Sequence, residues 1–129
     1  MTGGKLTTYR RMAQDAVDAL GIADAPCRTG SLPLVGARPQ PPGRLPRRLR
    51  ERFGSEAGRV AGYADEDASL LDPVAPGVPA LGVEVVHAVR CEGALDATDV
   101  LERRTRIAVV PADADRARDR VAEIVEAFG

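Results

Sequence analysis

The stretch TYRRMAQDAVDAL, residues 8–20, is the clearest structural signal in this chain of 129 residues. Its apolar residues recur at steps of three and one, which gathers them on one face of an α-helix. Thr7 or Thr8 can cap the N-terminus of this helix, and Gly21 follows where a C-terminal glycine is favoured. The pattern therefore predicts an amphipathic helix over Thr8–Leu20. The apolar residues of this face are Tyr9, Met12, Ala13, Ala16, Val17 and Leu20.

The chain beyond this helix alternates between proline-rich connections and shorter helical patterns. Residues 23–43 hold five prolines and three glycines, and residues 72–79 break regular structure again. Residues 106–110 suit a short strand or an extended link before Pro111. We therefore expect an all-α fold, a small bundle of five to six short helices with a long Pro/Gly-rich connection. The further helices are predicted over Leu45–Phe53, Ser55–Asp65, Ala80–Glu92, Asp96–Arg104 and Asp113–Phe128.

Composition excludes several classes of protein. The length suits one compact domain and is too short for a nucleotide-binding domain plus a substrate domain. Eighteen Lys and Arg residues against 19 Asp and Glu residues leave a formal net charge of -1, which argues against a uniformly basic nucleic-acid binder. No apolar run is long enough to span a membrane. We expect a soluble, cytoplasmic chain in which Cys27 and Cys91 are free thiols.

Residues 2–8, Thr-Gly-Gly-Lys-Leu-Thr-Thr, carry the strongest functional signal. Lys5 is the only lysine in the chain, beside 17 arginines. Two glycines would let a ligand approach the backbone closely, and free N–H groups at a helix start favour an anion or an electron-rich ring edge. The spacing matches neither a Walker loop nor a GxGxxG fingerprint. A capped helix after a turn is the structural alternative.

The segment from Gly3 to Arg10 resembles the GGK-x-TT-x-R motif of FAD-dependent glycerol-3-phosphate dehydrogenases. The rest of the chain resembles the helical C-terminal domain of that family. The matching stretches are Cys27–Thr29 with Leu32–Leu34, Leu45–Gly54, Glu84–Leu95 and, most specifically, Asp99–Arg106. The resemblance covers nearly the whole chain, with several motifs in the right order.

The resemblance implies a flavin site at the start of the chain. It assigns Gly3, Gly4, Lys5, Leu6, Thr7 and Thr8 to FAD binding, and it makes Lys5 the catalytic residue, near the reacting centre. There the lysine could stabilise a reduced flavin or meet the substrate phosphate. It also implies that residues 1–8 are a remnant of the FAD domain, a strand end and helix start, and that 9–129 form the helical C-terminal domain. Members of this family are often peripheral to the cytoplasmic membrane.

The chain departs from the family because it holds no GxGxxG turn for the ADP moiety and no substrate-domain sheet. We therefore expect the isolated chain to be catalytically incomplete and not to bind FAD tightly. Its expected partner is the missing FAD and substrate domain or a complementary chain, with a homo-oligomer as another option and no nucleic acid. Contact with a membrane stays open. The alternative from a different class is a stand-alone helical interaction module without enzymatic activity.

Two other patterns have competing interpretations. Glu84, His87 and Cys91 could share one helix face with metal-ligand spacing, but ordinary packing is favoured and no metal is predicted. An arginine-rich run could face nucleic acid or anionic lipid, but a solvated helix face, or docking onto an acidic surface of the missing domain, is favoured. The run comprises Arg38, Arg44, Arg47, Arg48, Arg50 and Arg52.

Overall fold

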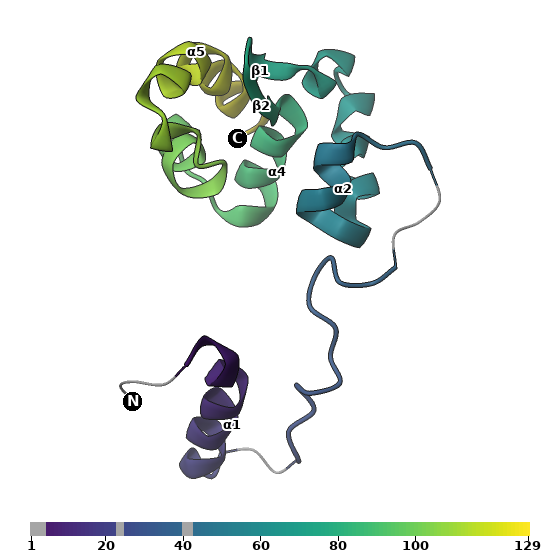
Figure 1. Ribbon diagram of the computed structural model, residues 1–129, viewed down its shortest axis with the longest axis vertical. Helices are drawn as coiled ribbons and strands as arrows, with labels where there is room; N and C mark the ends of the chain where they lie inside the picture. The colour runs from purple at the N-terminus through teal and green to yellow at the C-terminus, as the bar shows by residue number, and fades with distance from the viewer. Residues whose placement is uncertain (1–4, 23–24, 40–42) are drawn as a thin grey trace. The chain divides into compact units, whose positions relative to one another are not determined.

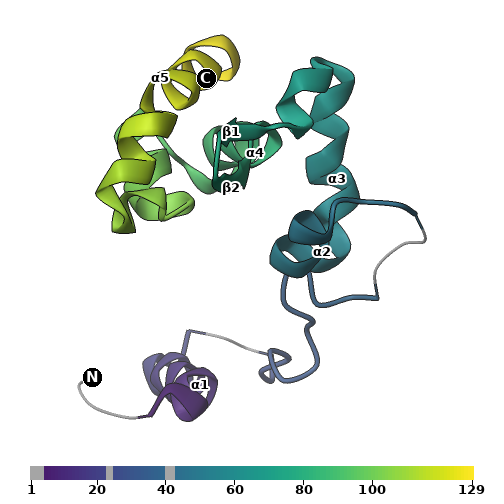
Figure 2. The ribbon, with the colours of Figure 1, turned by 45° about the horizontal axis from the view of Figure 1, so that its top comes forward.

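The structure, a computed structural model, describes residues 5–22, 25–39 and 43–129. Contacts divide the chain into two compact units, Met1–Leu34 and Val35–Gly129, which we describe separately. Helices dominate both, and one small two-stranded sheet lies in the second unit (Figures 1 and 2). The prediction of a small, mainly α-helical fold is confirmed. None of the helices in the described ranges is long and apolar enough to cross a membrane.

The first unit contains helix α1, Tyr9–Leu20, preceded by a 3-10 turn over Leu6–Thr8. The helix ends at Gly21, whose φ of 61° lies in the left-handed region that glycine adopts without strain. The predicted helix over Thr8–Leu20 is thus confirmed, starting one residue later. None of its residues is buried. Its apolar face therefore contributes no closed core to the described part of this unit.

The second unit begins with two short helices, α2 (Arg47–Phe53) and α3 (Ala57–Ala61). A 3-10 turn over Gly54–Glu56 joins them, and another over Gly62–Asp65 follows α3. The connection before α2 is anchored at Gly36, whose carbonyl accepts a hydrogen bond of 3.0 Å from the Ser55 amide. Both predicted helices in this region exist, although the second is interrupted by tighter turns.

A β-hairpin occupies the region after α3. Strands β1 (Pro73–Ala75) and β2 (Val78–Leu81) pair antiparallel, with Pro73 opposite Leu81 and Ala75 opposite Val78. The expectation that residues 72–79 form no regular structure is therefore wrong. Proline lacks an N–H donor, but each strand of a two-stranded sheet has one unpaired edge where that loss is harmless.

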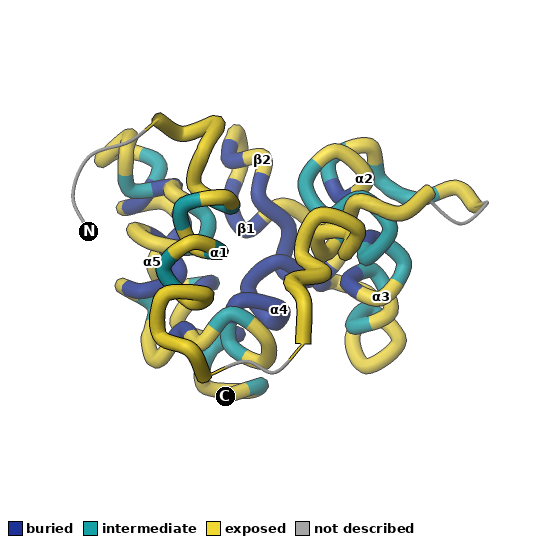
Figure 3. Tube along the Cα trace, turned by 90° about the horizontal axis from the view of Figure 1, so that it is seen from below, coloured by how far each residue is buried: buried dark blue, intermediate teal, exposed yellow. Residues whose placement is uncertain are grey.

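Helix α4, Gly82–Glu92, forms the centre of the second unit, and every residue from Gly82 to Ala88 is buried (Figure 3). It starts two residues later than predicted because Ala80 and Leu81 belong to β2. The core of this unit gathers around α4 from α2, α3, the hairpin and the C-terminal helix. Its largest fully buried side chains are Leu49, Val60, Leu70, Val78, Val83, Glu84, Val85, Val86, Val100, Leu101, Val121 and Ile124.

The last part of the chain contains a π-type helical segment over Asp99–Arg104, a 3-10 turn over Ile107–Val109 and helix α5, Pro111–Phe128. The expected strand or extended link over 106–110 is wrong. Val109 and Val110 donate amide hydrogen bonds to Arg106 and Ile107, which curls the segment instead of extending it. Helix α5 starts before Asp113 because Pro111 suits the first helical position.

Candidate functional site

The predicted flavin motif leads into α1. Gly3 and Gly4 lie outside the described residues, whereas Lys5, Leu6, Thr7 and Thr8 are all exposed. Within the part of the chain that the structure describes, the Lys5 ammonium group makes no ion pair. A compact positive charge therefore stands free at the start of a twelve-residue helix, whose first amides add partial positive charge.

Thr8 has a local structural role at this helix start. Its hydroxyl oxygen accepts a hydrogen bond of 3.2 Å from the Lys5 amide and lies 2.9 Å from the Lys5 carbonyl oxygen, to which it donates. The Thr8 amide donates to the same carbonyl at 2.9 Å. The structural alternative, a capped helix after a turn, is present only in part: the turn forms, but Thr8 at the N-cap of α1 makes no side-chain capping hydrogen bond to the helix. It leaves the Lys5 side chain outside the hydrogen-bonded turn.

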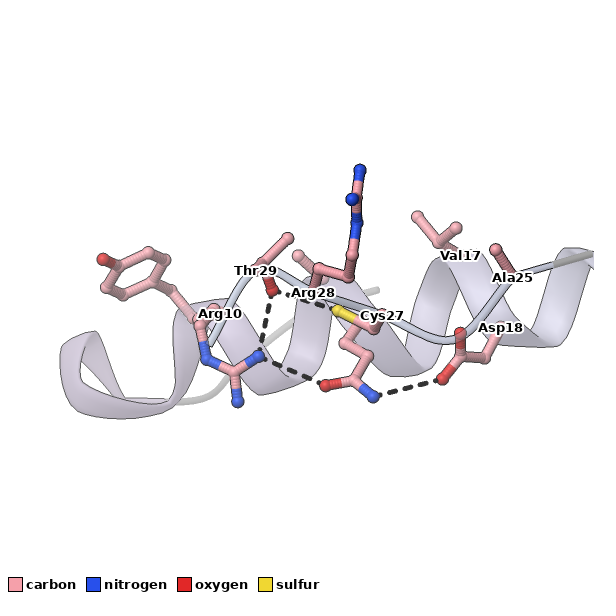
Figure 4. A pocket seen from close by; sticks show the side chains of 10 residues that line it. Arg10, Val17, Asp18, Ala25, Cys27, Arg28 and Thr29 are labelled. Atoms are coloured by element: carbon pink, nitrogen blue, oxygen red, sulfur yellow. Dashed lines mark hydrogen bonds between the residues drawn. The ribbon is translucent and has the colours of Figure 1, made fainter. Parts of the chain in front are cut away.

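A groove of about 370 Å³ runs between α1 and the segment after it, entirely within the first unit (Figure 4). Its wall is largely apolar on the side of α1. Tyr9 and Val17, two residues of the predicted apolar face, line it and are 59% and 46% exposed. The remaining lining residues are Arg10, Ala13, Gln14, Asp18, Ala25, Cys27, Arg28 and Thr29.

A row of hydrogen bonds fixes this segment against α1. One Arg10 nitrogen (Nη1) donates to Thr29 Oγ1 at 3.0 Å and to Gln14 Oε1 at 3.2 Å, and Gln14 donates to Asp18 at 3.5 Å. Cys27 Sγ lies 3.0 Å from Thr29 Oγ1, and this hydrogen bond lowers the pKa of the Cys27 thiol. The sequence alone predicted no site role for these residues. Arg10, Gln14 and Asp18 are spaced four residues apart, which places them on one face of a helix. This spacing could have indicated the row of hydrogen bonds along α1.

Glu84 is bound by arginines instead of a metal. Its fully buried carboxylate accepts hydrogen bonds from Arg48, from Arg52 at 2.9 Å and from the Leu81 amide at 3.0 Å. Arg52 also donates to the Arg104 carbonyl at 2.6 Å. The network joins α2 to the start of α4 and to the π-type segment. Two residues of the arginine-rich run therefore have an internal structural role.

His87 and Cys91 face a different environment from Glu84. The His87 ring packs edge-on against Phe53, with ring centroids 5.1 Å apart, and lies 6.1 Å from Tyr63. Cys91 Sγ is 3.1 Å from an Arg59 nitrogen and 3.5 Å from the Tyr63 hydroxyl. Across residues 5–22, 25–39 and 43–129, no three acidic, histidine or cysteine side chains are grouped to hold a metal ion.

The rest of the arginine-rich run is more open to solvent. Arg47 forms a surface ion pair with Glu51 at 2.6 Å, and its side chain is 82% exposed. Arg38 and Arg44 are exposed as well. The run is therefore not one continuous basic surface, because Arg48 and Arg52 turn inward to Glu84.

The fold and the exposed helix start together define a helical domain with its own core, linked to a helix that presents a lysine at its N-terminus. The family described as the C-terminal domain of alpha-glycerophosphate oxidase matches residues 27–128. The chain belongs to this family. The sequence-based identification is confirmed.

The match to one named relative extends to the predicted flavin motif. Glycerol-3-phosphate dehydrogenase 1 of Mycobacterium tuberculosis is 43% identical over 138 residues, covering 99% of this chain and 26% of that protein. Glycerol-3-phosphate dehydrogenase 2 of the same organism is 37% identical over 128 residues, covering 84% of this chain and 22% of that protein. A mitochondrial glycerol-3-phosphate dehydrogenase of Arabidopsis thaliana is 34% identical over 158 residues, covering 97% of this chain and 25% of that protein.

The chain spans about a quarter of the length of these relatives and corresponds to their C-terminal part. No solved structure shows a significant match to it.

Proposed function

We propose that this chain acts as the C-terminal part of an FAD-dependent glycerol-3-phosphate dehydrogenase, which converts glycerol 3-phosphate to dihydroxyacetone phosphate. The observation that supports this is the 43% identity to a named dehydrogenase over 99% of the chain, a span that reaches the Lys5 motif. In this proposal residues 1–8 belong to the FAD domain and 9–129 to the helical C-terminal domain. The chain works in the cytoplasm and is catalytically incomplete alone.

The described residues at the helix start fit a flavin. The family is FAD-dependent, and FAD supplies the hydride acceptor when it is bound. Lys5, Leu6, Thr7 and Thr8 are exposed, so none of the described residues of their unit covers this end of α1. A free ammonium group beside a helix N-terminus stabilises negative charge, either of a reduced flavin ring or of a substrate phosphate. Lys5 supplies that charge, while the backbone at Thr7 and Thr8 faces the ring edge.

The proposed partner is the remaining FAD and substrate-binding part, in the same chain or in a complementary one. The exposed apolar residues of the first unit support such a surface, because large exposed apolar patches mark interaction sites. Leu6, Tyr9 and Leu20 are 89%, 59% and 67% exposed. A surface of this kind would also promote self-association of the isolated chain.

A hybrid enzyme tests the proposal. This chain would replace the matching C-terminal quarter of the tuberculosis dehydrogenase 1, and glycerol-3-phosphate-dependent dye reduction would be measured with bound FAD quantified by absorbance. We expect an active hybrid, in which Lys5→Ala lowers kcat by about 100-fold, as loss of a positioned charge-stabilising donor does. Arg118→Ala, which removes an exposed charge on α5, is the matched control and should keep full activity.

A flavin titration of the isolated chain tests the second half of the proposal. No tight binding of FAD is expected. Contacts from one edge of a cofactor site contribute too little binding free energy to offset the entropy that FAD loses when it is ordered. Stoichiometric tight binding would contradict this and indicate a site rebuilt by self-association. A hybrid that folds and binds FAD but stays inactive would favour the stand-alone interaction module.

A further inference from the structure

Arg106 has a backbone conformation that L-residues rarely adopt. Its φ is 60°, and among the described residues it is the only non-glycine with a positive φ. It lies two residues beyond the end of the π-type segment, after Thr105, whose φ is -91°. Its φ matches those of the glycines that end α1 and α4, Gly21 at 61° and Gly93 at 68°. A side chain retained where glycine would be less strained indicates a role for that side chain.

In the part of the chain that the structure describes, the fold makes no use of the Arg106 side chain. The residue is exposed, and within the described part of the chain its guanidinium group has neither a hydrogen bond nor an ion pair. Its neighbour Arg103 pairs with Asp99, and only the backbone carbonyl of Arg106 serves the structure, by accepting from the Val109 amide. The strained backbone conformation of Arg106 therefore holds a guanidinium group that has no hydrogen-bond or ion-pair partner among the described residues.

Arg106 is one of the residues that line a small pocket of about 180 Å³ within the second unit. Arg48 lines the same pocket from α2, and β2 and the start of α5 form its other walls. The volume suits a phosphate group but not a nucleotide or a flavin. The remaining lining residues are Val78, Pro79, Ala80, Thr105, Ile107, Val110 and Asp113.

The charges around this pocket favour an anion. Arg48 and Arg52 share the single carboxylate of Glu84, so this network carries one excess positive charge, and Arg48 keeps its third nitrogen, Nη1, as a donor. The acidic residue at the pocket, Asp113, is already paired with Arg116 at 2.5 Å. The planar guanidinium group of arginine can donate two parallel hydrogen bonds to two oxygens of one phosphate group.

We propose that Arg106 and Arg48 form a binding site for the dianionic phosphate group of a phosphate monoester. The same chemistry is offered by a small soluble phosphate and by the headgroup of phosphatidic acid. This site goes beyond the proposed dehydrogenase function, since it lies in the second unit and requires neither flavin nor Lys5.

The test is an NMR titration of the full chain with inorganic phosphate at pH 7.5, against chloride at equal ionic strength. We expect saturable amide shifts centred on Thr105–Val110. Arg106→Gly should weaken phosphate binding at least about 10-fold without lowering the thermal unfolding midpoint, because glycine suits this conformation. Arg118→Ala removes the same charge outside the pocket and should leave the affinity unchanged. Unchanged affinity in Arg106→Gly, or equal loss in both variants, would overturn the proposal.

A vesicle sedimentation assay separates the two sources of phosphate. Phosphatidylcholine vesicles with and without phosphatidic acid would be compared for wild type and Arg106→Gly. Retention on phosphatidic acid that Arg106→Gly abolishes supports a lipid headgroup as ligand, whereas phosphate binding without vesicle retention supports a soluble one. Absence of both kinds of binding overturns the proposal, and none of these results depends on dehydrogenase activity.

Discussion

Glu84 is a charged residue in the core of this protein, and its neighbours explain how it is tolerated. Its side chain is fully buried, yet both carboxylate oxygens accept hydrogen bonds from arginines. Arg48 and Arg52 keep 32% and 25% of their side chains exposed, so their charges are partly hydrated. Removing the carboxylate would leave two adjacent guanidinium groups without their shared partner.

We therefore expect Glu84→Gln to destabilise the protein by about 3 kcal/mol, the lower end of the range for broken buried ion pairs, because the arginines are partly exposed. Urea unfolding followed by circular dichroism would measure the loss. Glu123→Gln, which breaks the surface pair with Arg120, should cost less than about 1 kcal/mol. Equal effects of the two substitutions would contradict the structural role of Glu84.

His87, the single histidine, should make stability depend on pH. Burial lowers its pKa below the ordinary value of 6.5, and the positive charges of Arg59 and Arg52 act in the same direction, while Glu92 and Glu56 oppose them. Over the interval between the folded and unfolded pKa values, the unfolded chain binds more protons than the folded one. The contribution of His87 to stability is therefore complete above pH 6.5 and is lost as the pH falls through the folded pKa.

Urea unfolding of wild type and His87→Gln between pH 7.5 and 5 checks this dependence. The difference in unfolding free energy between the two proteins should shift in favour of the variant as the pH falls below 6.5. A difference that stays constant with pH would show that His87 does not titrate differently in the folded state.

At the scale of elements, the connection before α2 is held by a close approach of two backbones. A Cβ atom on Gly54 would lie 2.0 Å from the Gly36 carbonyl oxygen, and the φ of Gly54 is 55°. The turn between α2 and α3 thus requires glycine for both space and conformation. Gly62, in the turn after α3, has a φ of -62° and open space around its Cβ position.

Gly54→Ala should therefore lower the free energy of unfolding by at least about 2 kcal/mol, through steric overlap and left-handed strain. Gly62→Ala is the matched control and should be neutral or stabilising by about 0.5 kcal/mol, since it reduces the entropy of the unfolded chain. Thermal melts of both variants would compare them. A Gly54→Ala variant as stable as wild type would mean that the Gly36 contact does not form in solution.

Element prediction from sequence succeeded where the pattern was local. The periodic stretches at α1, α2, α4 and α5 carry their apolar spacing and end signals within a few residues, so their existence could be predicted. The hairpin over 73–81 could not, because its prolines argue against a strand unless the pairing partner is known. Residues 106–110 have strand-like composition, but none of the described strands pairs with them, and local hydrogen bonds curl them into a turn.

For the whole molecule, the buried core lies entirely within the second unit as described. Its buried apolar members run from Leu49 to Ile124, whereas α1 in the first unit has no buried residue. A core that draws on one unit alone should fold without the other.

We expect a fragment of residues 35–129 to unfold cooperatively with a thermal midpoint within about 4 °C of the full chain, a difference of less than about 1 kcal/mol. Calorimetry of both proteins would test this. A fragment that is unfolded, or a midpoint far below that of the full chain, would show that residues 1–34 contribute to the core.

The helical class, the Pro/Gly-rich connection and the family could be predicted from the sequence, because helix periodicity and the Gly3–Arg10 motif are patterns of neighbouring residues. Lys5 could be singled out for the same reason. Tertiary structure alone decided the partners of Glu84, which lie 32 and 36 residues away along the chain. It also decided the free guanidinium group of Arg106 and the groove beside α1. Ion pairs and pockets depend on which distant segments meet, and that information is absent from local spacing.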